Sequence, residues 1–290
     1  MQSVTDIAGL NRVSRQILRN AAFAAADMAR SGRLAPATKP LVAVTMFGVT
    51  TPGVLQVERR LQEAGFETIT FHAVGSGGRA MEEMVAAGLI DGVVDYTISE
   101  LTDQLLGGIF SAGPNRLEAA GRAGIPQVIV PGAIEVLNFG PRATVPARFD
   151  TPERRLIVHN ENVTAVRTTR VEAESLGQIV AEKANLAKGP VAVMAPLQGF
   201  DSYQQRPDGP WIDAEADDGF YIALRQTLDP RIPLVELEAN INDKAFADAV
   251  AERFCALWAA RIEHFGGPLG GMKTDRSAIE KSPLRPQGEI

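Results

Sequence analysis

Short apolar runs rich in β-branched residues alternate with helical stripes through most of this chain. The runs that we expect to be strands are residues 41–44, 68–71, 92–95, 127–130, 191–194 and 233–237. The helices that we expect between and after them are residues 53–64, 78–87, 99–107, 114–123, 170–187, 213–228 and 243–263. This alternation predicts an α/β fold, namely a mostly parallel, doubly wound (Rossmann-like) sheet with helices on both faces.

The chain opens on a helical stripe that no strand precedes. Val13, Ile17 and Ala21 recur at helical spacing, and Ser3 and Thr5 can cap the helix. A helix with one apolar stripe and no earlier element needs a cover. We therefore expect a homo-oligomer, most simply a dimer formed through this helix.

The domain organisation follows from the same pattern. We expect a packing helix within residues 1–32, an α/β domain over residues 33–265 and a disordered, Gly- and Pro-containing tail over residues 266–290. A long central excursion, residues 132–168, interrupts the domain with several prolines and no sustained helical stripe. An excursion of this length is either functional or a bridging arm, and both interpretations stay open.

Composition excludes several classes of protein. The 29 Lys and Arg residues against 35 Asp and Glu residues give a net charge of −6, which disfavours a nucleic-acid binder. A single Cys excludes an intramolecular disulfide and a Cys-based zinc site. The chain has neither a signal-peptide core at its start nor the roughly 18 uninterrupted apolar residues of a membrane span. We therefore expect a cytoplasmic protein without nucleic-acid or membrane partners.

Ligands of open parallel sheets bind beyond the carboxyl ends of the strands, which directs attention to the loop after the first predicted strand. Thr50 and Thr51 lie there, directly before Pro52 at the predicted start of a helix. Their hydroxyls and the free amides of the helix could hold an anion. The alternative is a plain capped turn.

The loop after the second predicted strand is rich in glycine. His72 is followed by Gly75, Ser76, Gly77 and Gly78, a composition that lets the backbone approach a phosphate or carboxylate closely. The spacing matches neither a Walker A loop nor a dinucleotide-binding fingerprint. An anion loop and a structural turn both remain possible interpretations.

Glu100 and His159 are candidates for proton transfer, and Glu135 is a candidate ligand-binding residue. Glu100 and Glu135 follow the third and fourth predicted strands, so both are expected at the same sheet edge. His159, in the excursion, is the best candidate for a general acid or base, because imidazole ionises near neutral pH. A structural histidine is the alternative.

The excursion also carries groups that bind anions. Arg142 and Arg167 suit a clamp on a carboxylate or phosphate, and Asn160 and Asn162 add hydrogen-bond donors. A surface ion pair is the alternative for Arg167. The acids of residues 213–218 do not have the spacing of a calcium loop, and no metal site is expected.

Several of these segments resemble a known family. The segments that carry the resemblance are residues 3–11, 48–52, 72–78, 91–95, 100–101, 110–114, 126–135, 138–142, 159–160, 167–169 and 213–217. In order, they resemble the second, C-terminal lobe of the uncharacterised ATP-binding family named after the plant tomato mosaic virus resistance protein. The resemblance implies a nucleotide-binding first lobe in full-length members, which we expect to be absent here. It also implies ATP with Mg²⁺ as a cofactor.

Together, these observations predict a protein that binds a nucleotide or another phosphorylated or carboxylated small molecule at the carboxyl edge of its sheet. Two alternatives stay open. One is a small-molecule enzyme of hydrolase or lyase type, with His159 as acid or base and Glu100 as a second catalytic candidate. The other is a lobe that needs a separately encoded nucleotide-binding lobe.

Overall fold

The computed structural model describes residues 10–31, 38–205 and 209–265, and it divides the chain into two units, Met1–Thr38 and Lys39–Ile290. Helix α1 (Arg12–Ser31) is the described element of the first unit. It is capped by Asn11, whose side-chain oxygen accepts hydrogen bonds from the amides of Val13 and Ser14. The predicted caps Ser3 and Thr5 and the predicted tail, residues 266–290, lie outside the described residues.

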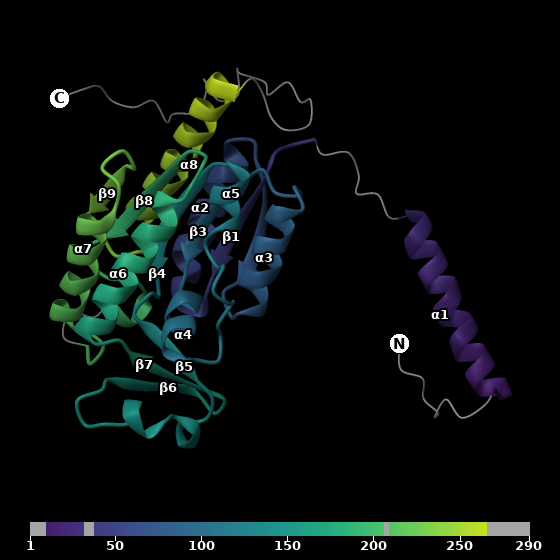
Figure 1. The fold of residues 1–290 in the computed structure, drawn as a ribbon, viewed down its shortest axis with the longest axis horizontal. Coiled ribbons are helices and arrows are strands. Elements are labelled where there is room, and N and C mark those ends of the chain that lie inside the picture. The colour runs from purple at the N-terminus through teal and green to yellow at the C-terminus, as the bar shows by residue number, and fades with distance from the viewer. Residues whose placement is uncertain (1–9, 32–37, 206–208, 266–290) are drawn as a thin grey trace. The chain divides into compact units, whose positions relative to one another are not determined.

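A six-stranded parallel sheet forms the centre of the second unit, with the strand order β2-β1-β3-β4-β8-β9 (Figure 1). Its strands are β1 (Leu41–Met46), β2 (Glu67–His72), β3 (Gly92–Thr97), β4 (Gln127–Gly132), β8 (Val191–Pro196) and β9 (Leu234–Leu237). The chain winds from β1 outward to β2 and then returns to the other side of β1 at β3. The topological switch point therefore lies between β1 and β3, and the predicted doubly wound fold is confirmed.

Helices cover both faces of this sheet. They are α2 (Thr51–Glu63), α3 (Ser76–Ala86), α4 (Glu100–Leu106), α5 (Ala119–Ala123), α6 (Arg170–Asn185), α7 (Ala214–Thr227) and α8 (Lys244–Phe265). In the part of the chain that the structure describes, no helix is both long and apolar enough to cross a membrane.

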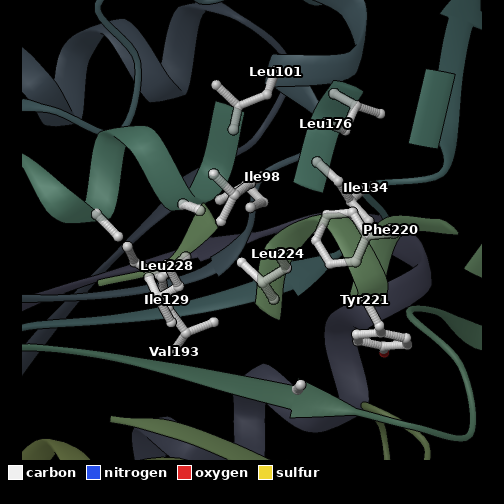
Figure 2. Packing of buried hydrophobic residues seen from close by; sticks show 14 of the residues in the cluster. Ile98, Leu101, Ile129, Ile134, Leu176, Val193, Phe220, Tyr221, Leu224 and Leu228 are labelled. Atoms are coloured by element: carbon white, nitrogen blue, oxygen red, sulfur yellow. The ribbon is translucent and has the colours of Figure 1, made fainter. Parts of the chain in front are cut away.

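The alternation of side chains along β4 shows how the two faces are filled. Val128 and Val130 pack with the apolar residues of α2 and α8, whereas Ile129 packs on the opposite face with α6 and α7. Figure 2 shows this second cluster, in which Ile129 and Val193 of the sheet lie beside Phe220 and Leu224 of α7. Both faces are therefore buried, which explains why the strands read as continuous apolar runs.

The helix predicted over residues 114–123 is shorter in the structure. Only α5 (Ala119–Ala123) is helical, and Leu117 has a positive φ of 75°. The reason is that the side chain of Arg116 is fully buried at the sheet edge, so the chain must turn there before the helix can begin. The prediction of a helix from residue 114 is wrong for this segment.

The predicted excursion contains a second, antiparallel sheet with the strand order β5-β7-β6. Its strands are β5 (Val136–Phe139), β6 (Leu156–Asn160) and β7 (Val163–Arg167), and β5 lies next to α4 (Figure 1). The 3-10 turns η2 (Arg142–Thr144) and η3 (Ala147–Phe149) connect β5 to β6, while η1 (Gly48–Thr50) and η4 (Ser202–Gln205) follow β1 and β8. The sequence predicted none of the strands of this small sheet.

Candidate functional site

A pocket of about 190 Å³ lies where the small sheet meets the carboxyl edge of the main sheet. The loops after β1 and β2 supply one side, and the small sheet supplies the other. Its lining residues are Phe47, Gly48, Val49, His72, Val74, Phe110, Val136, Asn138, His159, Asn160, Val163, Ala165 and Tyr203. We call it the His159 pocket. None of the described residues that line it is a lysine or an arginine.

The pocket brings together three of the predicted site residues. His72 comes from the end of β2, and His159 and Asn160 come from the end of β6 in the excursion. His159 Nδ1 lies 2.9 Å from the hydroxyl of Tyr203, a residue of η4 that the sequence analysis missed. Burial, with the charges of Asp201 and Glu135, raises the pKa of Tyr203 to about 12, so this hydroxyl stays protonated at neutral pH.

Asn138 is the most buried polar residue that lines the pocket, with 1% of its surface exposed. Its backbone amide and its side-chain Nδ2 both donate to the carboxylate of Asp103, at 2.9 and 2.8 Å. Its side-chain oxygen, Oδ1, has no hydrogen-bond partner. Burial raises the pKa of Asp103 to about 7, although the two hydrogen bonds from Asn138 act in the opposite direction.

The glycine-rich loop after β2 is occupied by a carboxylate of the chain itself. Glu100 Oε1 accepts hydrogen bonds from the amides of Gly75 and Gly78, at 2.6 and 3.2 Å. Gly75 has a φ of +83°, and a Cβ on Gly77 would lie 2.0 Å from the carbonyl oxygen of His72. Ser76 begins α3 and is exposed. The predicted anion loop stays a prediction, and two of its amides already have an anionic partner.

Glu100 belongs to a buried cluster that we call the Arg116 cluster, made of Arg116, Asp95, Glu100 and Glu82. Arg116 Nε donates to Glu100 at 2.6 Å, and Nη1 donates to Asp95 at 2.8 Å and reaches Glu82 at 3.3 Å. Arg116, Asp95 and Glu100 are fully buried. The geometry gives Glu100 a structural role in this cluster, while its predicted catalytic role has no further support.

Arg116 was not among the residues predicted from the sequence, although a signal for it was present. Asp95 and Glu100 flank the end of one predicted strand, and two buried carboxylates need a cation or protons. Arg116, in the next polar segment, is the cation that lies close enough. The sequence alone did not show that this segment folds back onto the sheet edge.

The hydroxyls of the threonines after β1 both bond to other groups of the chain. Thr50 occupies the N-cap position of α2, but its hydroxyl lies 2.7 Å from that of Thr97. The hydroxyl of Thr51 donates to the carbonyl of Phe47 at 3.1 Å. The amide of Gly53, in the first turn of α2, donates to Asn242. Both threonines therefore lie next to the pocket-lining loop without lining the pocket themselves.

The two predicted clamp arginines lie apart from the His159 pocket. Arg142 is exposed on η2, where Nη1 donates to Asp150 at 2.7 Å. Arg167 is buried at the end of β7, where it pairs with Asp217, while its Nε and Nη1 have no partner. Neither arginine lines the pocket.

Glu135 lies in the same interior network as Arg167. Its carboxylate accepts a hydrogen bond from the indole of Trp211 at 3.2 Å, and its side chain is buried. Burial raises the pKa of Glu135, and burial together with the charge of Glu135 raises the pKa of Asp201 well above its usual value. Two buried carboxyls this close disfavour the doubly ionised state, which agrees with the upward direction of both shifts.

Comparisons with known proteins identify the family. Residues 39–258 match the model described as the C-terminal domain of the uncharacterised protein family UPF0261, and residues 1–33 match that of its N-terminal domain. A UPF0261 protein of Clostridium tetani is 43% identical over 255 residues, which cover 87% of this chain and 62% of the relative.

A UPF0261 protein of Rhizobium meliloti is 41% identical, and the match covers 88% of this chain and 63% of that protein. The ToMV resistance protein Tm-1 of Solanum lycopersicum is 40% identical over 296 residues, covering 97% of this chain and 39% of the tomato protein. The chain thus spans less than two thirds of the length of these relatives. The match over residues 39–258 shows that the chain belongs to the UPF0261 family.

Proposed function

We propose that the His159 pocket binds a small carboxylated molecule and that His159 exchanges a proton with it. The observation that carries this proposal is the convergence of His72, His159 and Asn160 on one pocket from elements far apart in the sequence. Imidazole and amide groups bind a carboxylate without a fixed positive charge.

The size and charge of the pocket support a small ligand. Its volume of about 190 Å³ is below the range of about 300–1,000 Å³ that is usual for drug-sized ligands. Its lining contains histidines and asparagines, and the arginines predicted to clamp an anion lie elsewhere. Both properties favour an organic acid of a few carbon atoms over ATP with Mg²⁺.

The contact with Tyr203 supports His159 as the group that moves the proton. Nδ1 is the ring nitrogen that bonds to Tyr203, so Nε2 is the nitrogen available to a ligand. A hydroxyl that stays protonated can donate to Nδ1, which places the proton of the neutral ring on Nε2. In this state His159 donates a hydrogen bond to the ligand through Nε2. In the other tautomer Nδ1 donates to the oxygen of Tyr203, and Nε2 can accept a proton to form an imidazolium ion, which can return that proton.

A thermal-shift titration tests the proposal. The chain is titrated with lactate, pyruvate, malonate and succinate, and separately with ATP and MgCl₂. A ligand at 100 times its Kd adds about 2.7 kcal/mol to the free energy of unfolding, so saturation raises Tm measurably. We expect a shift with at least one small acid. A shift with ATP and Mg²⁺ alone would contradict the proposal and support the nucleotide-binding alternative.

Paired variants of the β6–β7 hairpin locate the ligand. His159→Gln removes the imidazole and weakens binding of the acid about tenfold or more, the loss expected for one hydrogen bond to a charged group. Glu161→Gln changes a charge on the exposed turn of the same hairpin outside the pocket lining, and is the matched control. Equal affinities in the two variants would remove His159 from the site.

The predicted homodimer remains a separate proposal. The apolar stripe of α1, with Val13, Ile17 and Ala21 at helical spacing, is the surface that supports it. Multi-angle light scattering on the chain should give twice the 31.0 kDa mass of one copy. A monomeric mass at all concentrations tested would contradict it.

A further inference from the structure

Asp103 restricts which atom of Asn138 a ligand can reach. The carboxylate accepts hydrogen bonds from both the backbone amide and the side-chain Nδ2 of Asn138. A carboxylate offers no donor, so the amide group of Asn138 is held with its nitrogen toward Asp103. The remaining polar atom of the side chain, Oδ1, is an acceptor without a partner.

The surrounding backbone holds this pair in place. Asp103 lies in α4, Asn138 in the adjacent strand β5, and the amide of Ile109 donates to the carbonyl of Asn138 at 2.9 Å. A Cβ on Gly108 would lie 1.5 Å from Asp103 Oδ1, so a glycine at this position leaves the space that the carboxylate occupies. The orientation of Asn138 is therefore set by tertiary structure rather than by its own loop.

We infer that the ligand of the His159 pocket carries a hydrogen-bond donor, a hydroxyl or an amino group, next to its carboxylate. The inference rests on the proposed function. A buried acceptor without a partner costs free energy, and a ligand donor at Asn138 Oδ1 removes that cost, whereas a ligand oxygen would be repelled. The structure thus selects hydroxy acids and amino acids over oxo acids.

Three acids of the same carbon skeleton test the inference at pH 8. Lactate and alanine carry a donor at the second carbon, whereas pyruvate carries only an acceptor there. Isothermal titration of the wild-type chain should show lactate or alanine bound at least about tenfold more tightly than pyruvate, the ratio expected for one satisfied against one unsatisfied hydrogen bond. Equal or tighter binding of pyruvate would overturn the inference.

An isosteric variant inverts the expected preference. In Asp103→Asn the new oxygen accepts the fixed backbone amide of Asn138, and the new Nδ2 faces the Asn138 side chain. Asn138 must then turn its own oxygen toward residue 103 and its Nδ2 toward the pocket. The variant should bind pyruvate more tightly than lactate, and an unchanged preference would overturn the inference.

The outcomes separate this inference from the proposed function. If wild-type chain binds all three acids equally, the proposed function stands and the selection by Asn138 is wrong. If the wild-type chain binds none of these three acids and neither malonate nor succinate, both the proposed function and this inference are wrong. The wild-type comparison decides the inference even if Asp103→Asn does not fold.

Discussion

The Arg116 cluster and the His159 pocket lie at the same carboxyl edge of the sheet. They differ in whether their polar groups have partners within the chain. In the cluster, Arg116 bonds to Asp95, Glu100 and Glu82 within the interior. In the pocket, Asn138 Oδ1 lacks a partner and His159 is exposed. The cluster lies beside β3 at the switch point, where open α/β sheets usually bind ligands. The charged side chains of the Arg116 cluster occupy the switch point, and the His159 pocket lies next to them.

The first prediction breaks the Arg116 cluster. Arg116→Met leaves the buried carboxylates of Asp95 and Glu100, and the half-buried carboxylate of Glu82, without their cation. We expect a loss of about 3–5 kcal/mol in the free energy of unfolding. Urea denaturation followed by circular dichroism measures it. Arg116→Lys keeps the charge but loses the forked geometry of the guanidinium group. Its free energy of unfolding should lie between those of wild type and Arg116→Met. A stability of Arg116→Met within error of wild type would show that the cluster is not structurally required.

The second prediction concerns the glycine between the two regions. Gly77→Ala places a Cβ against the carbonyl of His72, and overpacking of this kind costs about 1–3 kcal/mol. Gly48→Ala is the control, because a Cβ there has no atom within 4 Å. The urea midpoint of Gly77→Ala should therefore be lower than that of Gly48→Ala. A Gly77→Ala chain as stable as Gly48→Ala would mean that the backbone relaxes freely at this junction.

The third prediction follows from the carboxyl beneath the pocket. The pKa of Asp103 is about 7 in the folded chain, above its ordinary value of 3.8. Between these values the folded state keeps a proton that the unfolded state has lost. Asp103 therefore makes stability fall as pH rises from about 4 to about 7, by up to about 1.4 kcal/mol per pH unit.

Asp103→Asn removes the contribution of Asp103 to the pH dependence of stability, while the contributions of the other buried carboxyls remain. Urea denaturation at pH 5, 6 and 8 should give a shallower dependence of stability on pH in the variant than in wild type. The same slope in both chains would show that Asp103 does not titrate in this range. The measurement also reports whether the variant folds, which the ligand experiment requires.

The smallest effect is expected at the predicted clamp that lies outside both regions. Arg142→Gln removes an exposed ion pair with Asp150, and such pairs contribute little to stability. We expect unchanged stability and unchanged affinity for the small acid. Weaker binding of the acid would return Arg142 to the site.

Much of the fold could be predicted because it depends on local pattern. The runs at 41–44 and 191–194 lie within β1 and β8, since both faces of a parallel sheet are buried and every residue of these two runs is apolar. The small sheet escaped prediction for the opposite reason. No residue of β6 is fully buried, and its last two residues, His159 and Asn160, are polar and exposed. The pairing of β5 with β7 joins segments separated by a long loop.

The candidate site was predicted in part. His72, His159 and Asn160 were named from residue type and position after predicted strands, and they meet in one pocket. Glu100 and Arg167 were named by the same reasoning, and they lie in buried ion pairs instead. Residue type and strand order place a side chain at the sheet edge, but they do not show which neighbour it bonds to.

The doubly wound sheet follows from the sequence alone, because hydrophobic periodicity and strand-helix alternation are properties of successive residues. Which polar groups are neutralised and which lack a partner depends on the tertiary structure. The contacts of Arg116 with Glu82 and of Asp103 with Asn138 span 34 and 35 residues. Hydrogen bonds act over about 3 Å, so a segment that folds back onto the edge decides whether a carboxylate stabilises the fold or remains available to a ligand.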